Sequence, residues 1–559
     1  MLFALVLCAL LAAPALVQAE RASRLVQTAQ GPVLGYGDDG LFVFYSIPYA
    51  TAPTGPNKFK PPMPGPIWKE PFEAFDKGII CPQVQVKVEG LTFPDTQEED
   101  CLIANVYVPD TNESNLPVVV IVHGGGYQGG FGKMMVPKSL VKSKKIIAVS
   151  FNYRLGAHGF LCLGTEDAPG NAGMKDQVAL LRWVKKNIAN FGGNPNDVTI
   201  TGGSAGSSAV DLLQLTKTTD GLINKVIPES GANVGVWSVQ LDPLQNAKDY
   251  AKELNFTHLD DIYALEDFYK NLPLHKLLSD KFIIKKDSSV PFSPCVERDI
   301  GEERFLEDTP VNILRGGKYK KLPMLYGITE MEGMFRLGFN VFESWKHEMN
   351  EKFSDFLPAD LEFSSTDEKE IVAKEIKEFY FGNKTISEET ILSYIDYFTD
   401  VAFAYPTLRS VGLQVEAGND KVYLYEYSFV AKETPPMYQL IEMYGVRGAD
   451  HCAQTNALYE SGIFDSTWSE RTSNMRAKMR ELWLNFMTTG FPVPAGSEYP
   501  PWLPAGADGG PHMSLNEQIE LRGPLLARRA RFWDGIYARH YRQPVPPPAP
   551  LPKYCQHNF

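Results

Sequence analysis

The sequence has few cysteines and histidines, and it lacks any long run of positive charge. Its 559 residues include 7 Cys and 9 His. No cysteines are spaced as C-x-x-C, the pattern typical of structural zinc sites, so no metal is expected. The densest basic segment is 141–145, and the formal net charge is −13. This charge argues against nucleic acid as a ligand.

Long apolar runs are missing everywhere except at the N-terminus. Residues 2–17 are almost wholly apolar, and Val17 and Ala19 occupy the −3 and −1 positions of a cleavage site before Glu20. This pattern predicts a secretory signal peptide at 1–19. An uncleaved anchor is the alternative, because no Lys or Arg precedes the apolar run. No later stretch reaches the roughly 18 apolar residues of a membrane span, so we expect secretion without an anchor.

Glycosylation sequons and the remaining cysteines agree with an extracellular location. Sequons begin at Asn112, Asn255 and Asn383. Once Cys8 leaves with the signal peptide, the remaining cysteines are Cys81, Cys101, Cys162, Cys295, Cys452 and Cys555. In an oxidising compartment Cys81 and Cys101 would close a short loop, worth about 3 kcal/mol in the chain-entropy model. The other four are too scattered along the chain to be paired from sequence.

The composition is that of a globular protein with a large core. Apolar residues make up 44% and charged residues 22%, which excludes disorder, coiled coil and collagen for most of the chain. There is no internal repeat and no Gly/Ser linker. We therefore predict one large domain at 20–543, followed by an extended Pro-rich tail at 544–559.

Apolar periodicity predicts an α/β fold. Apolar strands are expected at 118–122 and 146–151, and a β-branched strand at 198–201. Between them, 174–188 has apolar residues on one helical face. Such alternation indicates a mostly parallel central sheet with helices on both faces. Two further helical, charged stretches are expected as insertions over the active site, at 241–320 and 341–400.

A G-x-S-x-G motif occupies residues 202–206 and centres on Ser204. It lies between a β-branched strand and an apolar helix, the context in which a tight turn exposes a nucleophilic serine. The helix start also supplies free backbone N–H groups. The alternative is a Ser-rich helix cap without catalytic function.

A glycine loop that could stabilise an oxyanion precedes this motif by about 80 residues. His123 and three glycines, 124–126, follow the strand at 118–122. Glycines let such a loop aim its N–H groups at a developing alkoxide. A phosphate-binding loop is the alternative, but the required Lys-Ser/Thr is missing.

The general base must be one of the nine histidines. In this fold the order along the chain is Ser, acid, His, which excludes His123 and His158. His451 follows a predicted strand at 422–427 in a Gly-containing loop and is the best candidate, a structural loop histidine being its alternative. His512 follows Gly-Gly-Pro and is expected in a surface turn. The others lie in charged helical stretches or near the tail: His258, His275, His347, His540 and His557.

The third catalytic group, an acidic residue that orients the general base, should lie between Ser204 and His451 in the sequence. Glu330 and Glu332 follow a predicted strand that begins at Pro323. Either carboxylate could orient the imidazole and stabilise its charged form. The residues alone leave both open.

Many collinear segments resemble the type-B carboxylesterase/cholinesterase family of the α/β-hydrolase fold, in a form most similar to insect carboxylesterases. They cover almost the entire mature chain and include 44–50, 99–102, 123–127, 152–156, 159–161, 170–177, 191–195, 202–206, 332–333 and 448–451. The resemblance implies a Ser-His-Glu triad and the family's first disulfide. The implied residues are Ser204 as nucleophile, His451 as base, Glu332 as acid, Gly125, Gly126 and Ala205 as oxyanion donors, and Cys81–Cys101 as the disulfide.

Departures from the family pattern bear on the substrate. Cholinesterases carry Glu before the nucleophile, where this chain has Gly203, and a Trp in the first disulfide loop, where 82–100 has none. A cation–π contact to acetylcholine would be missing. Juvenile-hormone esterases prefer Gln at the position of Gly203 and an acid at that of Gln454, and Cys452 after the histidine is unusual.

We therefore expect a secreted serine carboxylesterase that hydrolyses small apolar esters through an acyl-enzyme, with no metal or organic cofactor. Two alternatives remain. One is a catalytically weakened family member that acts as a binding or adhesion protein. The other is a hormone hydrolase of the juvenile-hormone esterase type.

Overall fold

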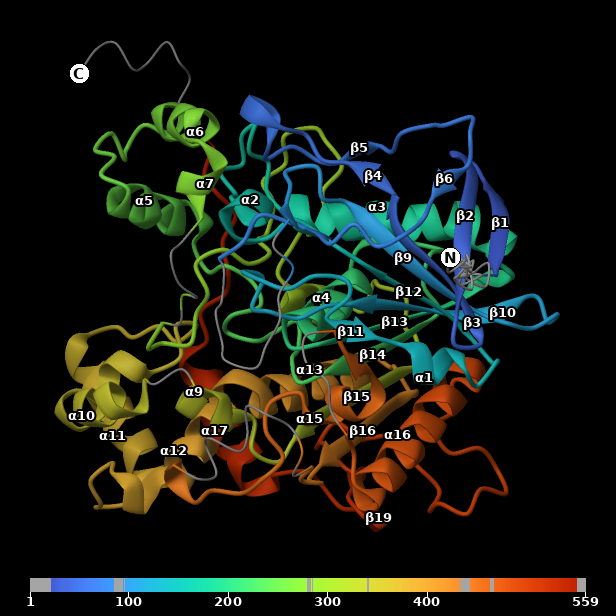
Figure 1. Ribbon diagram of the computed structural model, residues 1–559. Coiled ribbons are helices and arrows are strands. Elements are labelled where there is room, and N and C mark those ends of the chain that lie inside the picture. The colour runs from blue at the N-terminus through green and yellow to red at the C-terminus, as the bar shows by residue number, and fades with distance from the viewer. Residues whose placement is uncertain are drawn as a thin grey trace, which may run out of the picture.

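A computed structural model describes residues 22–84, 94, 96–278, 283, 285–338, 341–431, 433, 443–462 and 467–549 (Figure 1). The predicted signal peptide, Cys8 and Cys555 lie outside the described residues. Of the Pro-rich tail, 544–549 is described; this part contains no helix or strand, and the Val545 N–H donates to the Leu241 carbonyl over 2.9 Å.

A 13-stranded sheet forms the centre of the structure (Figure 1). Twelve strands follow one another across it in this order: β1 (Ser23–Thr28), β2 (Gly31–Asp38), β3 (Leu41–Pro48), β9 (Ile103–Pro109), β12 (Ile147–Phe151), β10 (Leu116–Val122), β13 (Gly193–Gly203), β14 (Lys225–Glu229), β15 (Met324–Thr329), β16 (Val422–Tyr427), β18 (His512–Leu515) and β19 (Ile519–Arg522). The short β6 (Phe72–Glu73) pairs with β2. Neighbours from β12 to β18 are parallel, and the pairs outside this block are antiparallel apart from the short β2–β6 pair. The predicted mostly parallel sheet is confirmed.

Helices cover both faces of the sheet, and further helices belong to the two insertions. Those packed around the sheet are α1 (Lys138–Val141), α2 (Gly156–Phe160), α3 (Ala172–Asn187), α4 (Ala205–Leu213), α13 (Tyr405–Glu416), α15 (Ala453–Leu458), α16 (Glu470–Thr489) and α17 (Ala527–His540). The predicted insertions contain α5 (Pro243–Glu253), α6 (Ile262–Asn271), α7 (Leu274–Leu277), α8 (Pro310–Gly316), α10 (Phe342–Glu351), α11 (Thr366–Phe381) and α12 (Ile391–Thr399). In Figure 1, α5–α7 lie at the upper left and α10–α12 at the lower left.

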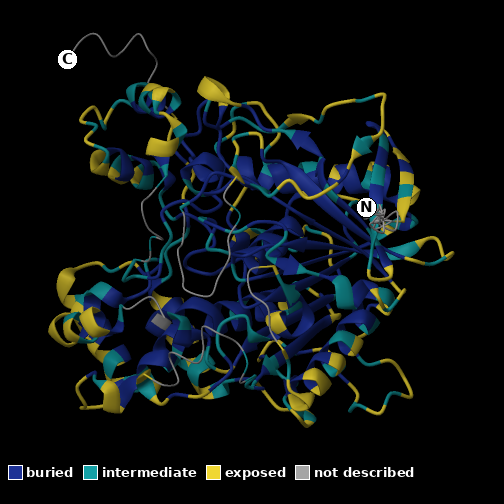
Figure 2. Ribbon diagram, viewed as in Figure 1, coloured by how far each residue is buried: buried dark blue, intermediate teal, exposed yellow. Residues whose placement is uncertain are grey.

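Alternate residues of one strand show how the sheet divides the core. On β10, Val120 packs into the cluster that contains Leu181 of α3, whereas Ile121 packs into the cluster that contains Trp483 of α16. All four side chains are at least 98% buried. Burial of each such aliphatic side chain contributes about 1.5–3 kcal/mol, so a strand apolar on both faces is stable only between two helical layers. The buried sheet is the dark blue centre of Figure 2.

Two disulfides cross-link the described chain. Cys81 and Cys101 are bonded, as expected, with their Cα atoms 5.0 Å apart. Cys162 and Cys295 are bonded across 133 residues, a pairing that the sequence left open. It ties the chain after α2 to the insertion that contains α5–α8.

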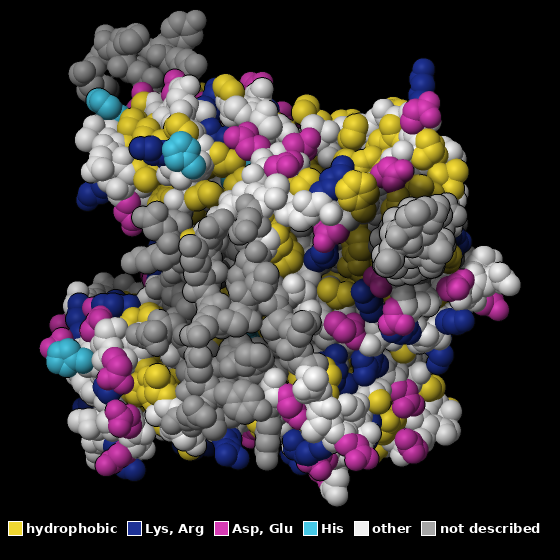
Figure 3. Space-filling view, in the orientation of Figure 1, with side chains coloured by type: hydrophobic (Ala, Val, Ile, Leu, Met, Phe, Trp, Pro, Cys, Tyr) yellow, Lys and Arg dark blue, Asp and Glu magenta, His cyan; other side chains and the backbone are white. Residues whose placement is uncertain are grey.

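The three sequon asparagines, Asn112, Asn255 and Asn383, are exposed. Acidic and basic side chains are interspersed over the described parts of the face shown in Figure 3. Among the described residues, no helix combines the length and apolar character that crossing a membrane would demand.

The expectation of a surface turn at His512 is wrong. His512 begins β18 and is 5% exposed, and its Nδ1 lies 2.6 Å from the Gly523 carbonyl oxygen. The cause is tertiary pairing, since β18 lies between β16 and β19 in the sheet.

Candidate active site

Ser204 occupies a sharp turn between β13 and α4. Its φ of 58° lies in the left-handed region, which disfavours side chains with a Cβ and stores strain. The turn needs glycines on either side, because a Cβ on Gly206 would lie 2.1 Å from the Val122 carbonyl oxygen. The Ser204 N–H donates to the Glu229 carbonyl oxygen over 2.9 Å, which fixes the turn against β14. The serine is thereby held at the carboxyl end of a parallel strand.

His451 and Glu332 complete a hydrogen-bonded chain with this serine. His451 Nε2 lies 2.9 Å from Ser204 Oγ, and Nδ1 lies 2.6 Å from Glu332 Oε2. The Thr329 N–H donates to Glu332 Oε1 over 2.7 Å. The carboxylate is fully buried, while the imidazole side chain is 17% exposed. This geometry allows the imidazole to accept the serine proton while the carboxylate stabilises the resulting charge.

The two candidate acids lie in different surroundings. Glu332 begins a short 3₁₀ turn after β15 and faces His451, whereas Glu330 is exposed at the surface. Between them, the Met331 N–H donates to the Ala449 carbonyl over 2.9 Å. This bond ties the loop that carries Glu332 to the loop that carries His451. Glu332, and not Glu330, contacts the imidazole.

The glycine loop passes directly over the serine turn. A Cβ on Gly124 would lie 3.1 Å from Ser204 Cβ, and Gly125 and Gly126 have φ values of 109° and 59°, which favour glycine. Ala205 is the first residue of α4, where backbone N–H groups have no partner within the helix. The loop and the helix start therefore meet at Ser204.

His123 anchors this loop as a neutral residue. Its Nδ1 lies 2.8 Å from the Gly124 carbonyl oxygen, and its ring stacks on Tyr153 with 4.3 Å between centroids. Burial lowers the pKa of His123 to about 4. It is uncharged at neutral pH and serves the loop through packing.

Aromatic rings pack against the imidazole of His451 near the helical insertions. Phe403 and Phe335 have ring centroids 4.3 and 5.5 Å from that of His451. Trp237 packs on Phe403 at 5.8 Å, and its Nε1 donates to the Ala402 carbonyl over 2.8 Å. Phe403 belongs to a π-helical segment, Asp400–Ala404, between α12 and α13. Such segments cluster at functional sites, but no sequence signal marked this one.

A free thiol lies beside the imidazole. Cys452 Sγ is 3.6 Å from His451 Nε2, and the side chain is half-buried. Burial raises the pKa of the Cys452 thiol, so it is protonated at neutral pH. A Cβ on Gly203 would lie 3.3 Å from this sulfur and 3.1 Å from Thr455 Oγ1. Cys452 and Thr455 therefore fill the space that a side chain at position 203 would need.

A second buried carboxyl group lies behind the serine turn. Glu229 is fully buried and accepts hydrogen bonds from Thr455 Oγ1 (3.0 Å) and Trp483 Nε1 (2.9 Å). Burial raises the pKa of Glu229 to about 8. The carboxyl is therefore mostly protonated at pH 7 and places little negative charge behind the serine turn. No motif in the sequence singles out Glu229.

The charge balance of the imidazole is set by opposing effects. Burial acts to lower the pKa of His451, while the neighbouring Cys452 and Glu332 act to raise it and prevail. Because the Cys452 thiol is itself protonated, we attribute the rise to the Glu332 carboxylate at Nδ1. The same carboxylate is placed to stabilise an imidazolium at this position.

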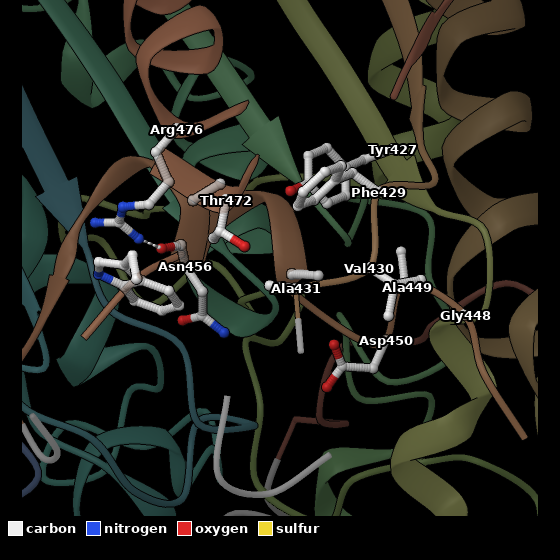
Figure 4. A pocket seen from close by; sticks show the side chains of 13 residues that line it. Tyr427, Phe429, Val430, Ala431, Gly448, Ala449, Asp450, Asn456, Thr472 and Arg476 are labelled. Atoms are coloured by element: carbon white, nitrogen blue, oxygen red, sulfur yellow. Dashed lines mark hydrogen bonds between the residues drawn. The ribbon is translucent and has the colours of Figure 1, made fainter. Parts of the chain in front are cut away.

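A small pocket lies beside the segment that precedes His451 (Figure 4). Its lining includes Tyr427, Phe429, Asp450, Asn456, Thr472 and Arg476. Burial raises the pKa of Asp450 to about 7. A second titratable group therefore lies next to His451 in the chain.

Comparison with known proteins places the chain among esterases. Residues 22–533 match the carboxylesterase family. The chain is 32% identical to esterase FE4 of Myzus persicae over 505 residues, covering 86% of each protein. It is 30% identical to a juvenile hormone esterase of Tribolium castaneum over 507 residues, covering 84% of each.

A solved structure has the same fold. The crystal structure of juvenile hormone esterase from Manduca sexta, with OTFP covalently attached, has a TM-score of 0.81 and 28% identity to this chain. The match covers 92% of this chain and all of that structure. The predicted α/β-hydrolase fold is confirmed.

Proposed function

The chain belongs to the carboxylesterase family and is an enzyme, a carboxylic ester hydrolase, and on this premise we propose that Ser204, His451 and Glu332 are its catalytic triad. The observation that carries the proposal is the unbroken chain of contacts, 2.9 Å from Ser204 Oγ to Nε2 and 2.6 Å from Nδ1 to Glu332. Both distances suit proton transfer and its electrostatic support.

In the acylation step, Ser204 Oγ attacks the ester carbonyl carbon while its proton moves to His451 Nε2. The carbonyl oxygen becomes an alkoxide, which we assign to the N–H groups of Gly125, Gly126 and Ala205. When the C–O bond of the ester breaks, His451 returns the proton to the leaving alcohol. The acyl group is then bonded to Ser204 Oγ.

In the deacylation step, water attacks the acyl-enzyme and gives its proton to His451. The second alkoxide collapses, the acyl–Oγ bond breaks, and the proton returns to Ser204. The carboxylic acid leaves and the free enzyme is restored. Each step uses groups of this chain, the ester and water.

We assign apolar esters as the substrate class. The aromatic wall of Trp237, Phe335 and Phe403 supports this assignment, because it offers apolar surface next to the imidazole. A juvenile-hormone-type ester is the second candidate, favoured by the likeness to the Manduca sexta enzyme. The departures at Gly203 and Gln454 argue against it.

We further propose that the protein is secreted, with a signal peptide at 1–19, one catalytic domain at 20–543 and a Pro-rich tail at 544–559. The N-terminal sequence pattern, two disulfides and three exposed sequon asparagines support this location. A catalytically weakened binding protein is the rival, and the intact contacts of the triad argue against it.

The test is hydrolysis of a short-chain aryl ester by wild type and by Ser204→Ala, with organophosphate labelling mapped by mass spectrometry. Turnover by wild type, a loss of several orders of magnitude in the variant and a label on Ser204 would support the proposal. A folded wild-type protein that neither hydrolyses nor labels would overturn it. Competition between aryl esters and a juvenile-hormone-type ester then separates the two substrate candidates.

A further inference from the structure

Arg336 is a buried cation that the proposed triad does not use. It lies in the short helix α9 (Phe335–Gly338), four residues after Glu332, and is 4% exposed. Its guanidinium lies over three rings, 4.6 Å from Phe335, 5.2 Å from Trp345 and 5.3 Å from Phe398. Cation–π attraction stabilises the charge in this aromatic cage, but the rings accept no conventional hydrogen bonds from the N–H groups.

Among the described residues no carboxylate forms an ion pair with the guanidinium, and the nearby Asp287 only partly offsets burial, which lowers the pKa of Arg336 to about 10. Its Nη2 donates to Ser288 Oγ over 3.2 Å, whereas the buried Nε and Nη1 have no hydrogen-bond partner there. Arg154, a fully buried arginine elsewhere, contrasts with it, since Asp176 contacts its Nε and Nη2 at 2.8 and 2.6 Å. A buried guanidinium that has no ion pair and two unpartnered nitrogens is unfavourable, so Arg336 calls for an acceptor that carries negative charge at Nε and Nη1.

Tyr394 supplies an independent donor in the same cage. Its side chain is fully buried, its ring lies 4.8 Å from that of Phe398, and its hydroxyl has no hydrogen-bond partner among the described residues. Burial raises the pKa of Tyr394, and the nearby charge of Arg336 partly offsets the rise. The hydroxyl is therefore protonated and able to donate. Arg336 and Tyr394 reach the cage from different helices, α9 and α12.

We propose that Arg336 and Tyr394 bind a small monovalent anion, such as chloride, within this cage. The anion would accept hydrogen bonds from Nε and Nη1 of Arg336 and from the Tyr394 hydroxyl, while the edges of the surrounding rings present positive potential to it. It would join α9 to α12. Because Phe335 of α9 lies 5.5 Å from the His451 ring, anion binding also supports the aromatic wall of the active site.

The experiment measures thermal unfolding of the full secreted protein in sodium gluconate, chloride, bromide and acetate at equal ionic strength. We expect halide at about ten times its Kd to raise the Tm by about 1 °C relative to gluconate. Crystals soaked in bromide should give an anomalous peak within hydrogen-bond distance of Arg336 and the Tyr394 hydroxyl. A matching effect of acetate would extend the anion class to carboxylates.

Tyr394→Phe tests the site without removing the buried cation. This variant should lose most of the halide-dependent shift. Tyr397→Phe is the matched control, because the Tyr397 hydroxyl on the same helix already donates to the Phe356 carbonyl over 2.6 Å, and the halide shift should survive in it. No bromide peak, no halide-specific rise in Tm, or a full shift in Tyr394→Phe would overturn the proposal. None of these readouts requires the protein to hydrolyse esters.

Discussion

Replacing Glu332 with Gln tests how the imidazole is oriented. Thr329 N–H donates to Oε1 of this residue over 2.7 Å, so the amide oxygen of Gln should keep that bond. The amide NH₂ group then faces His451 Nδ1 in place of the acceptor that now lies at 2.6 Å. Nδ1 must accept, the ring proton moves to Nε2, and Nε2 can no longer take the proton of Ser204.

The expected loss in kcat is about 10⁴-fold, the usual effect of the wrong imidazole tautomer in a triad. It corresponds to about 5.5 kcal/mol of transition-state stabilisation. Since Gln has the shape of Glu and the Thr329 bond remains, the Tm should change little. Binding of the aryl ester does not involve this fully buried side chain, so KM should stay within a few-fold of the wild-type value.

The assay measures kcat and KM for an aryl ester, with active-site titration by an organophosphate to count competent sites. Glu330→Gln is the matched control, because its carboxylate is exposed two residues away and does not contact His451. This control should keep wild-type kcat. The reasoning is refuted if Glu332→Gln retains kcat within tenfold of wild type, or if Glu330→Gln loses as much.

Three further perturbations follow from contacts around the site. The Cys452 sulfur lies 3.6 Å from His451 Nε2, so methylthiolation of this thiol should lower esterase activity at least tenfold. Dithiothreitol should restore the activity. If the reagent inhibits Cys452→Ala equally, this sulfur is not the target. The pKa of Glu229 is about 8 in the folded protein and about 4.3 in the unfolded chain, so its contribution to stability is full below about pH 4.3 and is lost as pH rises through 8. In urea titrations at pH 5.5 and 8.5, Glu229→Gln should therefore reduce this loss of unfolding free energy. An equal loss between the two pH values in wild type and variant would contradict the assignment. The double variant Cys162→Ala/Cys295→Ala removes a cross-link over 133 residues. Its unfolding free energy should fall by about 3–5 kcal/mol. Unchanged urea unfolding would show that the bond does not constrain the unfolded chain.

Local patterns predicted the layers of the fold because its central strands are apolar on both faces. The strand expected at 118–122 is β10, and the helix expected at 174–188 is α3 at Ala172–Asn187. His512 shows the limit of this reasoning. The glycines before it favour a turn, but pairing with β16 and β19 decides its conformation, and a short strand leaves no periodic signal.

Two residues of the candidate site could be predicted because histidines are few in this chain and because glycines must flank the serine. Ser204 and His451 follow from a glycine motif and a short supply of histidines. The two candidate acids, Glu330 and Glu332, are chemically equal in sequence, and only the resemblance to the family or the fold separates them. Phe403 was missed because its contact with His451 depends on a π-helical segment. Arg336 was missed because its burial and its unpartnered nitrogens are visible only in three dimensions.

The spread of the proposed triad along the chain has a consequence for folding. Glu332 and His451 are 119 residues apart, and Ser204 and His451 are 247 residues apart. Loops of this size close slowly, because chain entropy is lost before any contact compensates for it. β13, β15 and β16 must find their places before the three side chains can meet. During refolding, helical signal should therefore return well before ester hydrolysis, and recovered turnover would count only those molecules whose whole sheet has assembled.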